Sequence, residues 1–114
     1  MNLSYAVERL LDTGWSPATL NRPDLERLPD GRPYPTVEAV RREFADAGFE
    51  LSLKYDFTFN CCRATWSPSG DTPDPRQIGG EQHGTVVESS ETEAAVYALA
   101  KLRASRAKRA LRAV

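Results

Sequence analysis

The sequence is poor in the residues that build metal centres and many active sites. Among its 114 residues it has one histidine, His83, and two adjacent cysteines, Cys61 and Cys62. Three such side chains cannot complete the four-ligand shell of a structural zinc site. Neighbouring cysteines on a strand point to opposite faces, so a disulfide between them would be strained. We therefore expect no metal site and no disulfide, with one cysteine in the core and one at the surface.

Long apolar runs and the common catalytic motifs are also missing. The chain has no stretch of about 18 apolar residues, which argues against a membrane-spanning helix, and its first residues lack the features of a secretion signal. It has no glycine-rich phosphate loop, no nucleophile elbow and no HExxH motif. We expect a cytoplasmic, non-enzymatic protein without a cofactor or an evident small-molecule site. An enzyme that uses Cys62 or His83 is the least favoured alternative.

Charge is distributed unevenly along the chain. Six basic residues and no acidic residue lie from position 101 to the end, which leaves nine basic against 16 acidic residues before it. A solvated helix end, a contact with nucleic-acid phosphates and a dock for an acidic protein surface all explain this pattern. The candidate partner-binding residues are Lys101, Arg103, Arg106, Lys108, Arg109 and Arg112.

The strongest structural signal is the alternation of apolar and polar residues from Phe49 to Asn60. This period of two predicts strands with one buried and one wet face. The wet face of the first strand has no aromatic residue, so it lacks the stacking platform of a single-strand-binding sheet. At Cys61 the phase of the alternation reverses. Either a bulge or a hairpin turn must absorb the reversal, and we favour a hairpin with its turn near 56–60.

Three segments combine apolar residues at helical spacing with a capping residue at the start. We predict helices over residues 3–13, 36–47 and 91–110. Ser90 and Glu93 have the spacing of a capping box at the start of the third helix. Five prolines between 16 and 35 predict an irregular segment, in which 24–28 has the composition for one helical turn. Its leucines favour a wrap over the core rather than a linker.

Together these signals predict a single α+β domain over residues 1–114. A three-stranded antiparallel sheet (49–56, 60–67 and 84–88) packs on two helices in the order α-β-β-β-α, with an additional N-terminal helix. The expected parts are 1–35 (N-terminal helix and proline-rich wrap), 36–105 (the α-β-β-β-α core), 68–83 (a functional or disordered loop) and 106–114 (a basic helix end). The predicted core comprises Leu3, Val7, Leu10, Leu11, Trp15, Val37, Val40, Phe44, Phe49, Leu51, Leu53, Tyr55, Trp66, Val86, Val96, Leu99 and Leu102.

The order of elements over 36–105, with Gly84 opening the third strand and Ser89-Ser90 leading into an alanine-rich helix, resembles the double-stranded-RNA-binding domain. It is also similar to small two-layer domains encoded by phages and prophages. The resemblance implies the α-β-β-β-α fold. Where that family has phosphate-binding lysines, this chain has Glu91 and Glu93. We therefore expect a binding or adaptor protein that contacts another protein or a second copy of itself, with nucleic-acid binding through the basic C-terminal helix as the alternative.

Overall fold

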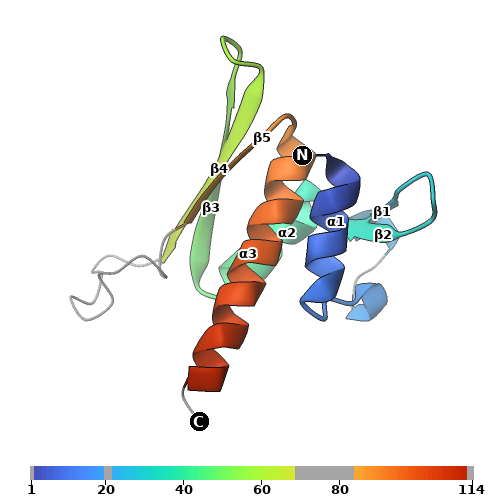
Figure 1. Ribbon diagram of the computed structural model, residues 1–114, viewed down its shortest axis with the longest axis vertical. Coiled ribbons are helices and arrows are strands. Elements are labelled where there is room, and N and C mark those ends of the chain that lie inside the picture. Colours follow the sequence, from blue (N-terminus) through green and yellow to red (C-terminus); the bar gives the residue numbers. More distant parts are fainter. Residues whose placement is uncertain (1, 20–21, 69–83, 113–114) are drawn as a thin grey trace.

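A computed structural model describes residues 2–19, 22–68 and 84–112, with the side chains of all of these except 19, 22 and 107–112. In this part of the chain, three helices and five strands form an α+β fold, as predicted (Figure 1). The helices are α1 (Leu3–Asp12), α2 (Val37–Asp46) and α3 (Glu91–Arg112). The strands are β1 (Leu25–Arg27), β2 (Pro33–Pro35), β3 (Phe49–Asp56), β4 (Cys61–Pro68) and β5 (Gly84–Glu88). Short 3₁₀ turns occupy Pro17–Thr19 and Arg22–Asp24.

The main sheet has the strand order β3-β4-β5, and both strand pairs are antiparallel. Residues 57–60 form the turn between β3 and β4, so the predicted hairpin is confirmed and no bulge is needed. This turn absorbs the phase reversal at Cys61, because it brings Leu51 of β3 opposite Trp66 of β4 on the same face. The strand boundaries predicted at 49–56 and 84–88 are correct, and the middle strand lies one residue later than 60–67.

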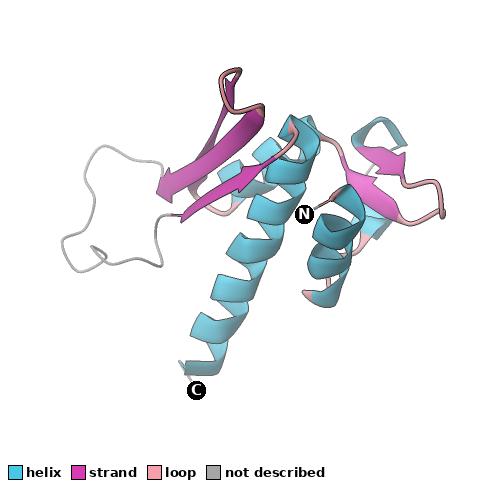
Figure 2. Cartoon of the chain, turned by 45° about the horizontal axis from the view of Figure 1, so that its top comes forward, coloured by secondary structure: helices cyan, strands magenta, loops and turns pink. Residues whose placement is uncertain are grey.

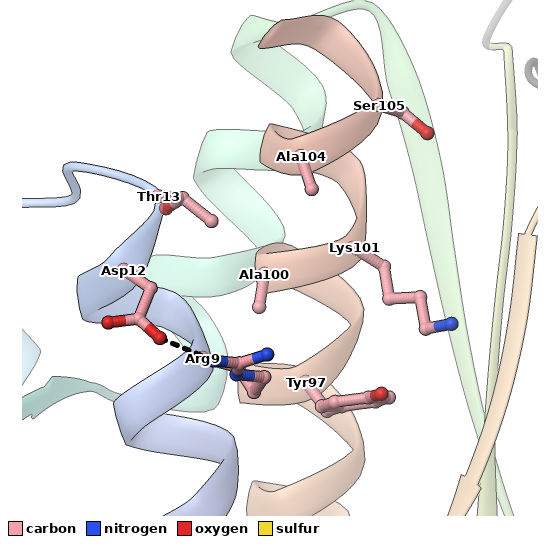
Figure 3. A pocket seen from close by; sticks show the side chains of 8 residues that line it. All are labelled: Arg9, Asp12, Thr13, Tyr97, Ala100, Lys101, Ala104 and Ser105. Carbon is pink, nitrogen blue, oxygen red and sulfur yellow. Dashed lines mark hydrogen bonds and ion pairs between the residues drawn. The ribbon is translucent and has the colours of Figure 1, made fainter. Parts of the chain in front are cut away.

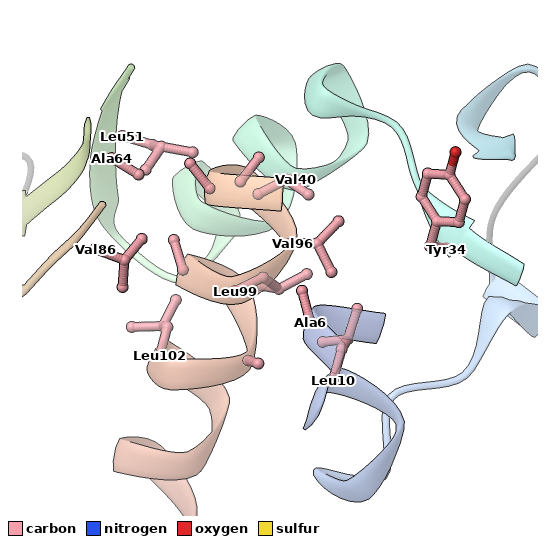
Figure 4. Packing of buried hydrophobic residues seen from close by; sticks show 14 of the residues in the cluster. Ala6, Leu10, Tyr34, Val40, Leu51, Ala64, Val86, Val96, Leu99 and Leu102 are labelled. Atoms are coloured by element: carbon pink, nitrogen blue, oxygen red, sulfur yellow. The ribbon is translucent and has the colours of Figure 1, made fainter. Parts of the chain in front are cut away.

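Helix α3 lies at the centre of the fold, between the main sheet and α1 (Figures 1 and 4). Helix α2 packs beside α3 on the same face of the sheet. Because α3 has neighbours on several sides, buried residues surround much of its first half, and most of them are small. They are Ala94, Ala95, Val96, Ala98, Leu99, Ala100 and Leu102. Alanines at these contacts let the neighbouring elements approach closely while still removing apolar surface from water.

The predicted core is largely correct. Val7, Leu10, Trp15, Val40, Phe44, Leu51, Trp66, Val86, Val96, Leu99 and Leu102 are buried, and Leu3, Leu11, Val37, Phe49 and Leu53 pack against them while partly exposed. The prediction is wrong for Tyr55, which is 42% exposed because its end of the hairpin extends past the helices (Figure 1). Leu28, Tyr34 and Ala64 are buried although they are not in the predicted core, and Cys62 is the buried member of the cysteine pair, one of which was expected in the core.

The proline-rich segment is more regular than predicted. The helical turn expected at 24–28 is wrong, because 25–27 form strand β1, which pairs with β2 in a second hairpin. The turn forms around Pro29-Asp30-Gly31, where Gly31 has φ 92° and its N–H donates to Leu28 O at 2.8 Å. Leu28 and Tyr34 are buried, so this segment is a wrap over the core rather than a linker. The second hairpin lies on the far side of α1 from the main sheet (Figure 2).

Side-chain caps begin the helices where the sequence indicates. The Tyr5 N–H donates to Asn2 Oδ1 at 2.9 Å, and the Glu93 N–H donates to Ser90 Oγ at 3.2 Å. Only this half of the predicted capping box is present in the described chain, since the Glu93 carboxylate accepts a hydrogen bond from the Ser89 hydroxyl instead. The observed α3 ends two residues after the predicted limit of 110.

Candidate functional site

The end of the β3–β4 hairpin carries the most exposed large apolar side chains of the described chain. Phe57 is 86% exposed, Phe59 is 77% exposed and Tyr55 is partly covered by Phe57, with ring centroids 4.8 Å apart. We call these three residues the aromatic tip. In both overall views the tip projects beyond the helices (Figures 1 and 2). Large exposed aromatic side chains on one projecting element are unusual for a surface that only contacts water.

Hydrogen bonds hold the backbone of the tip in one conformation. Asp56 Oδ1 accepts from the Thr58 N–H at 2.9 Å and from the Phe59 N–H at 3.4 Å. Asn60 adopts the left-handed region (φ 51°), and its Oδ1 accepts from the Tyr55 hydroxyl at 3.0 Å. Asp and Asn are the residues that favour such turns. The backbone that carries the rings is therefore held in place, which lowers the entropy cost of binding.

The tip is uncovered because the third strand is short. Strand β5 ends at Glu88, which lies opposite Cys62, and the chain then turns into α3. Cys62 in turn lies opposite Tyr55. Beyond this row the hairpin has only two strands and no described helix beneath it (Figure 1).

Two cations lie just behind the tip, on the outer face of the sheet. Lys54 and Arg63 are directly opposite each other, and both are exposed. Like charges placed opposite each other on a sheet destabilise the pair. The alternation along β3 places Lys54 on the opposite face of the sheet from Tyr55, so this pair of cations is separate from the rings of the tip.

A second candidate site is a groove of about 590 Å³ between α1 and α3 (Figure 3). Helix α1 contributes Arg9 and Asp12 to one wall, with Thr13 at the end of the helix. Helix α3 contributes Tyr97 and Lys101 to the other wall, and the residues between the walls are Ala100, Ala104 and Ser105. Because alanine side chains are short, the space between the two helices stays open at this point.

Two tyrosine rings and two cations lie close together at one edge of this groove. Tyr5 and Tyr97 lie 6.3 Å apart between ring centroids, at an interplanar angle of 37°. The Arg9 guanidinium lies 5.6 Å from the Tyr5 ring, and the Lys101 amine lies 5.5 Å from the Tyr97 ring. Arg9 also pairs with Asp12 at 2.6 Å, so the net positive charge of the groove comes from α3.

The structure separates the basic residues predicted as one binding set. Lys101 lines the groove and Arg106 is exposed, but Arg103 reaches towards the body of the protein. Arg103 Nε donates to Thr13 Oγ1 at 3.0 Å, and its Nη1 lies 3.9 Å from Glu43 Oε2. Arg103 thus links α3 to α1 and α2, which gives it a structural role. Lys108, Arg109 and Arg112 belong to α3, and their side chains lie outside the described part.

The residues considered for catalysis are poorly placed or undescribed. Cys62 is 1% exposed, and its burial, together with the nearby Glu91 carboxylate, raises the pKa of its thiol. A buried protonated thiol is a poor nucleophile, so the geometry does not support catalysis by Cys62. Cys61 is partly exposed, as expected for one member of the pair. His83 and the rest of the predicted 68–83 loop lie outside the described residues, except Pro68, which belongs to β4.

Two further absences concern the described residues alone. They contain no cluster of three or more His, Cys, Asp or Glu side chains that would hold a metal ion. None of their helices has the length and apolar character needed to cross a membrane.

Sequence reasoning missed the parts of the site that depend on which segments lie together. Phe57 and Phe59 fall in the predicted turn at 56–60, and nothing in the sequence marks their rings as a binding surface. Tyr5 and Tyr97 are 92 positions apart, and nothing in a single sequence pairs them. Comparisons of the chain with known protein families, with curated proteins and with solved structures found no match in any of the three.

Proposed function

We propose that this chain is a binding protein that docks on another protein through the aromatic tip. The observation that carries the proposal is the exposure of Phe57 (86%) and Phe59 (77%) on a turn held by side-chain hydrogen bonds. Aromatic anchors of this kind supply most of the binding energy at many protein interfaces. The preferred partner surface has an apolar pocket that receives the tip.

The size of the expected effect follows from the buried area. Transfer of one phenylalanine side chain from water into an apolar pocket contributes about 1.5–3 kcal/mol. Loss of both phenylalanines is therefore expected to weaken a complex by at least about a hundredfold. An ordered turn retains more of this energy than a flexible loop does, because less entropy is lost on binding.

The charge of the tip favours protein over nucleic acid. From Tyr55 to Asn60 the single charged side chain is Asp56, whose Oδ1 already accepts two backbone hydrogen bonds. Phosphate contacts would require cations within the tip itself. The two cations behind it, Lys54 and Arg63, lie on the outer face of the sheet, which is the opposite face from that of Tyr55.

The proposal is tested with a double variant, Phe57→Ser with Phe59→Ser, and a matched control, Val87→Ser. Val87 is also an exposed apolar residue (49%), but it lies on β5, on the outer face of the sheet opposite Arg63, and not on the turn. Wild type, tip variant and control are used as affinity baits in extracts of cells that express the chain. Any candidate partner is then purified and titrated against all three proteins.

We expect a partner that binds the wild type and the control alike and loses at least about a hundredfold in affinity for the tip variant. Equal affinity for all three proteins would contradict the proposal. So would flotation with lipid vesicles that depends on the tip, because the tip would then be a membrane contact. Melting curves of both variants are recorded to check that the fold is intact.

A further inference from the structure

The α1–α3 groove has features that the aromatic tip does not need and does not explain. Its lining includes Tyr97 and Lys101 from α3 and Arg9 from α1, and Tyr5 lies beside Tyr97, on a different part of the surface from the β3–β4 turn (Figures 1 and 3). Tyr5 is 42% exposed, although it is a large aromatic side chain on a short helix. Hydrophobic burial within the chain therefore does not account for this tyrosine.

Positive charge continues from the groove along α3. Lys101 lines the groove, and positions 108 and 112 follow it by about two and three helical turns on the same face of the helix. Both positions carry basic residues, Lys108 and Arg112. No acidic residue follows Glu93 in the sequence, so this face of α3 has no negative charge of its own. The last turns of α3 extend past the end of α1 (Figure 1).

The polar groups of the groove are in part already used within the protein. Thr13 donates to Leu10 O at 2.6 Å and accepts from Arg103, and Asp12 pairs with Arg9. Lys101 has no hydrogen bond or ion pair within the described part of the chain, and its amine points away from α1 (Figure 3). An incoming ligand is therefore expected to meet the α3 cations and the tyrosine rings first.

We infer that the groove binds single-stranded nucleic acid. Lys101 and the basic positions that follow it on the same face of α3 would attract the phosphate backbone, and the tyrosine rings beside Lys101 would stack on unpaired bases. The outer face of β3 has no aromatic ring that could stack on a base, whereas α1 and α3 carry Tyr5 and Tyr97. Exposed tyrosine rings cannot stack on the bases within a duplex, because neighbouring base pairs already cover the faces of those bases. Single strands are therefore expected to bind more tightly than duplexes of the same sequence.

This inference is independent of the proposed function. The tip variant Phe57→Ser with Phe59→Ser leaves the groove intact, so it is expected to bind nucleic acid as the wild type does. Conversely, failure to bind nucleic acid would leave protein docking through the tip unaffected. A chain with both activities would hold a partner protein and a nucleic-acid strand at two separate surfaces.

Fluorescence anisotropy with labelled oligonucleotides of about 12 nucleotides tests the inference, because single-strand sites usually span about 4–16 nucleotides. Single strands and matching duplexes are titrated at about 50 and about 200 mM salt. One variant removes a ring, Tyr5→Ser, and a second removes cations, Lys101→Gln with Lys108→Gln. The control, Lys54→Gln with Arg63→Gln, makes the same change in charge on β3 and β4, where both side chains are exposed.

We expect salt-sensitive binding of single strands, with affinity reduced about tenfold by Tyr5→Ser. The lysine variant reduces affinity and also flattens the dependence on salt. The control binds as the wild type does. Three results would each overturn the inference: no binding at about 50 mM salt, equal binding of duplexes, or equal losses in the control and the lysine variant. Unchanged affinity in Tyr5→Ser would remove the stacking role.

Discussion

At one end of the β3–β4 hairpin, Leu51 and Trp66 lie opposite each other and are buried beneath α2 and α3. At the other end, Phe57 and Phe59 are exposed, although they continue the same alternation of apolar and polar residues. The alternation determines which residues share a face of the strand. It does not determine whether another element covers that face. Cover is lost where β5 ends and the chain turns into α3, and the uncovered rings are available to a partner.

The largest expected contrast is between two phenylalanines at the two ends. Phe44 is fully buried on α2 and packs edge-on against Trp66, with ring centroids 5.6 Å apart. Phe44→Ala leaves a cavity and should destabilise the fold by about 3–5 kcal/mol. Phe57→Ala should change stability by less than about 0.5 kcal/mol, because its ring contacts mainly water. Urea denaturation of both variants measures the difference, and equal losses would show that the tip is packed in solution.

Packing at the covered end of the sheet also depends on Gly84, which has no side chain. A Cβ atom at Gly84 would lie 1.9 Å from Trp66 Cζ2, and the Trp66 ring is held in place by Phe44. Gly84→Ala should therefore cost about 1–3 kcal/mol through overpacking. Thr85→Ala, at the next and exposed position, is the control and should cost much less. Near-equal melting temperatures for the two variants would mean that Trp66 moves aside freely.

The order of the exposed end depends on one residue in the left-handed region. Asn60→Ala places a Cβ-bearing residue at φ 51° and removes the acceptor for the Tyr55 hydroxyl, at a cost of about 1 kcal/mol. Asn60→Gly removes the same acceptor but relieves the backbone, so its cost should be smaller. Denaturation midpoints compare the two. A larger loss for glycine than for alanine would contradict the described turn.

The smallest expected effect is a change in the pH dependence of stability. It concerns Glu88, which lies opposite Cys62 in the last row where the sheet has three strands. Burial raises the pKa of Glu88, and repulsion from Glu93 adds to the shift. The folded state therefore binds this proton more tightly than the unfolded state does. Stability contributed by the protonated form is present below the unfolded pKa and is lost as pH rises through the folded pKa.

Glu88→Gln removes this titration. The variant should be at least as stable as the wild type at neutral pH and should lose less stability between mildly acidic and neutral pH. Melting temperatures across that range measure the effect. A variant that is less stable than the wild type at neutral pH would show that the Glu88 carboxylate stabilises the fold.

Local chemistry in the sequence was enough to predict most of the fold. Caps at Asn2, Thr36 and Ser90 begin the three helices, and the reversal at Cys61 places the hairpin turn. The second hairpin was missed because β1 and β2 have three residues each, too few for a period to show. Their stability comes from burial of Leu28 and Tyr34 against the core, which is a property of the folded chain.

The candidate sites were less accessible to prediction. The basic residues of α3 were identified, but their division into a groove-lining Lys101 and a structural Arg103 depends on where α1 and α2 lie. Within the aromatic tip, Tyr55 is wrongly predicted to be in the core, and Phe57 and Phe59 are predicted only as turn residues, since the length of β5 relative to the hairpin cannot be judged from alternation alone. Long-range packing, rather than local pattern, therefore decides which apolar residues are available for binding.

Site-specific photo-crosslinking tests protein docking through the tip most directly. A photoreactive residue is placed at Thr58, between the two exposed phenylalanines, or at Thr85, on the exposed face of β5. We predict that position 58 forms an adduct with a partner protein in extracts of cells that express the chain, and that position 85 does not. Adducts from position 85 alone, or from both positions equally, would contradict docking through the aromatic tip.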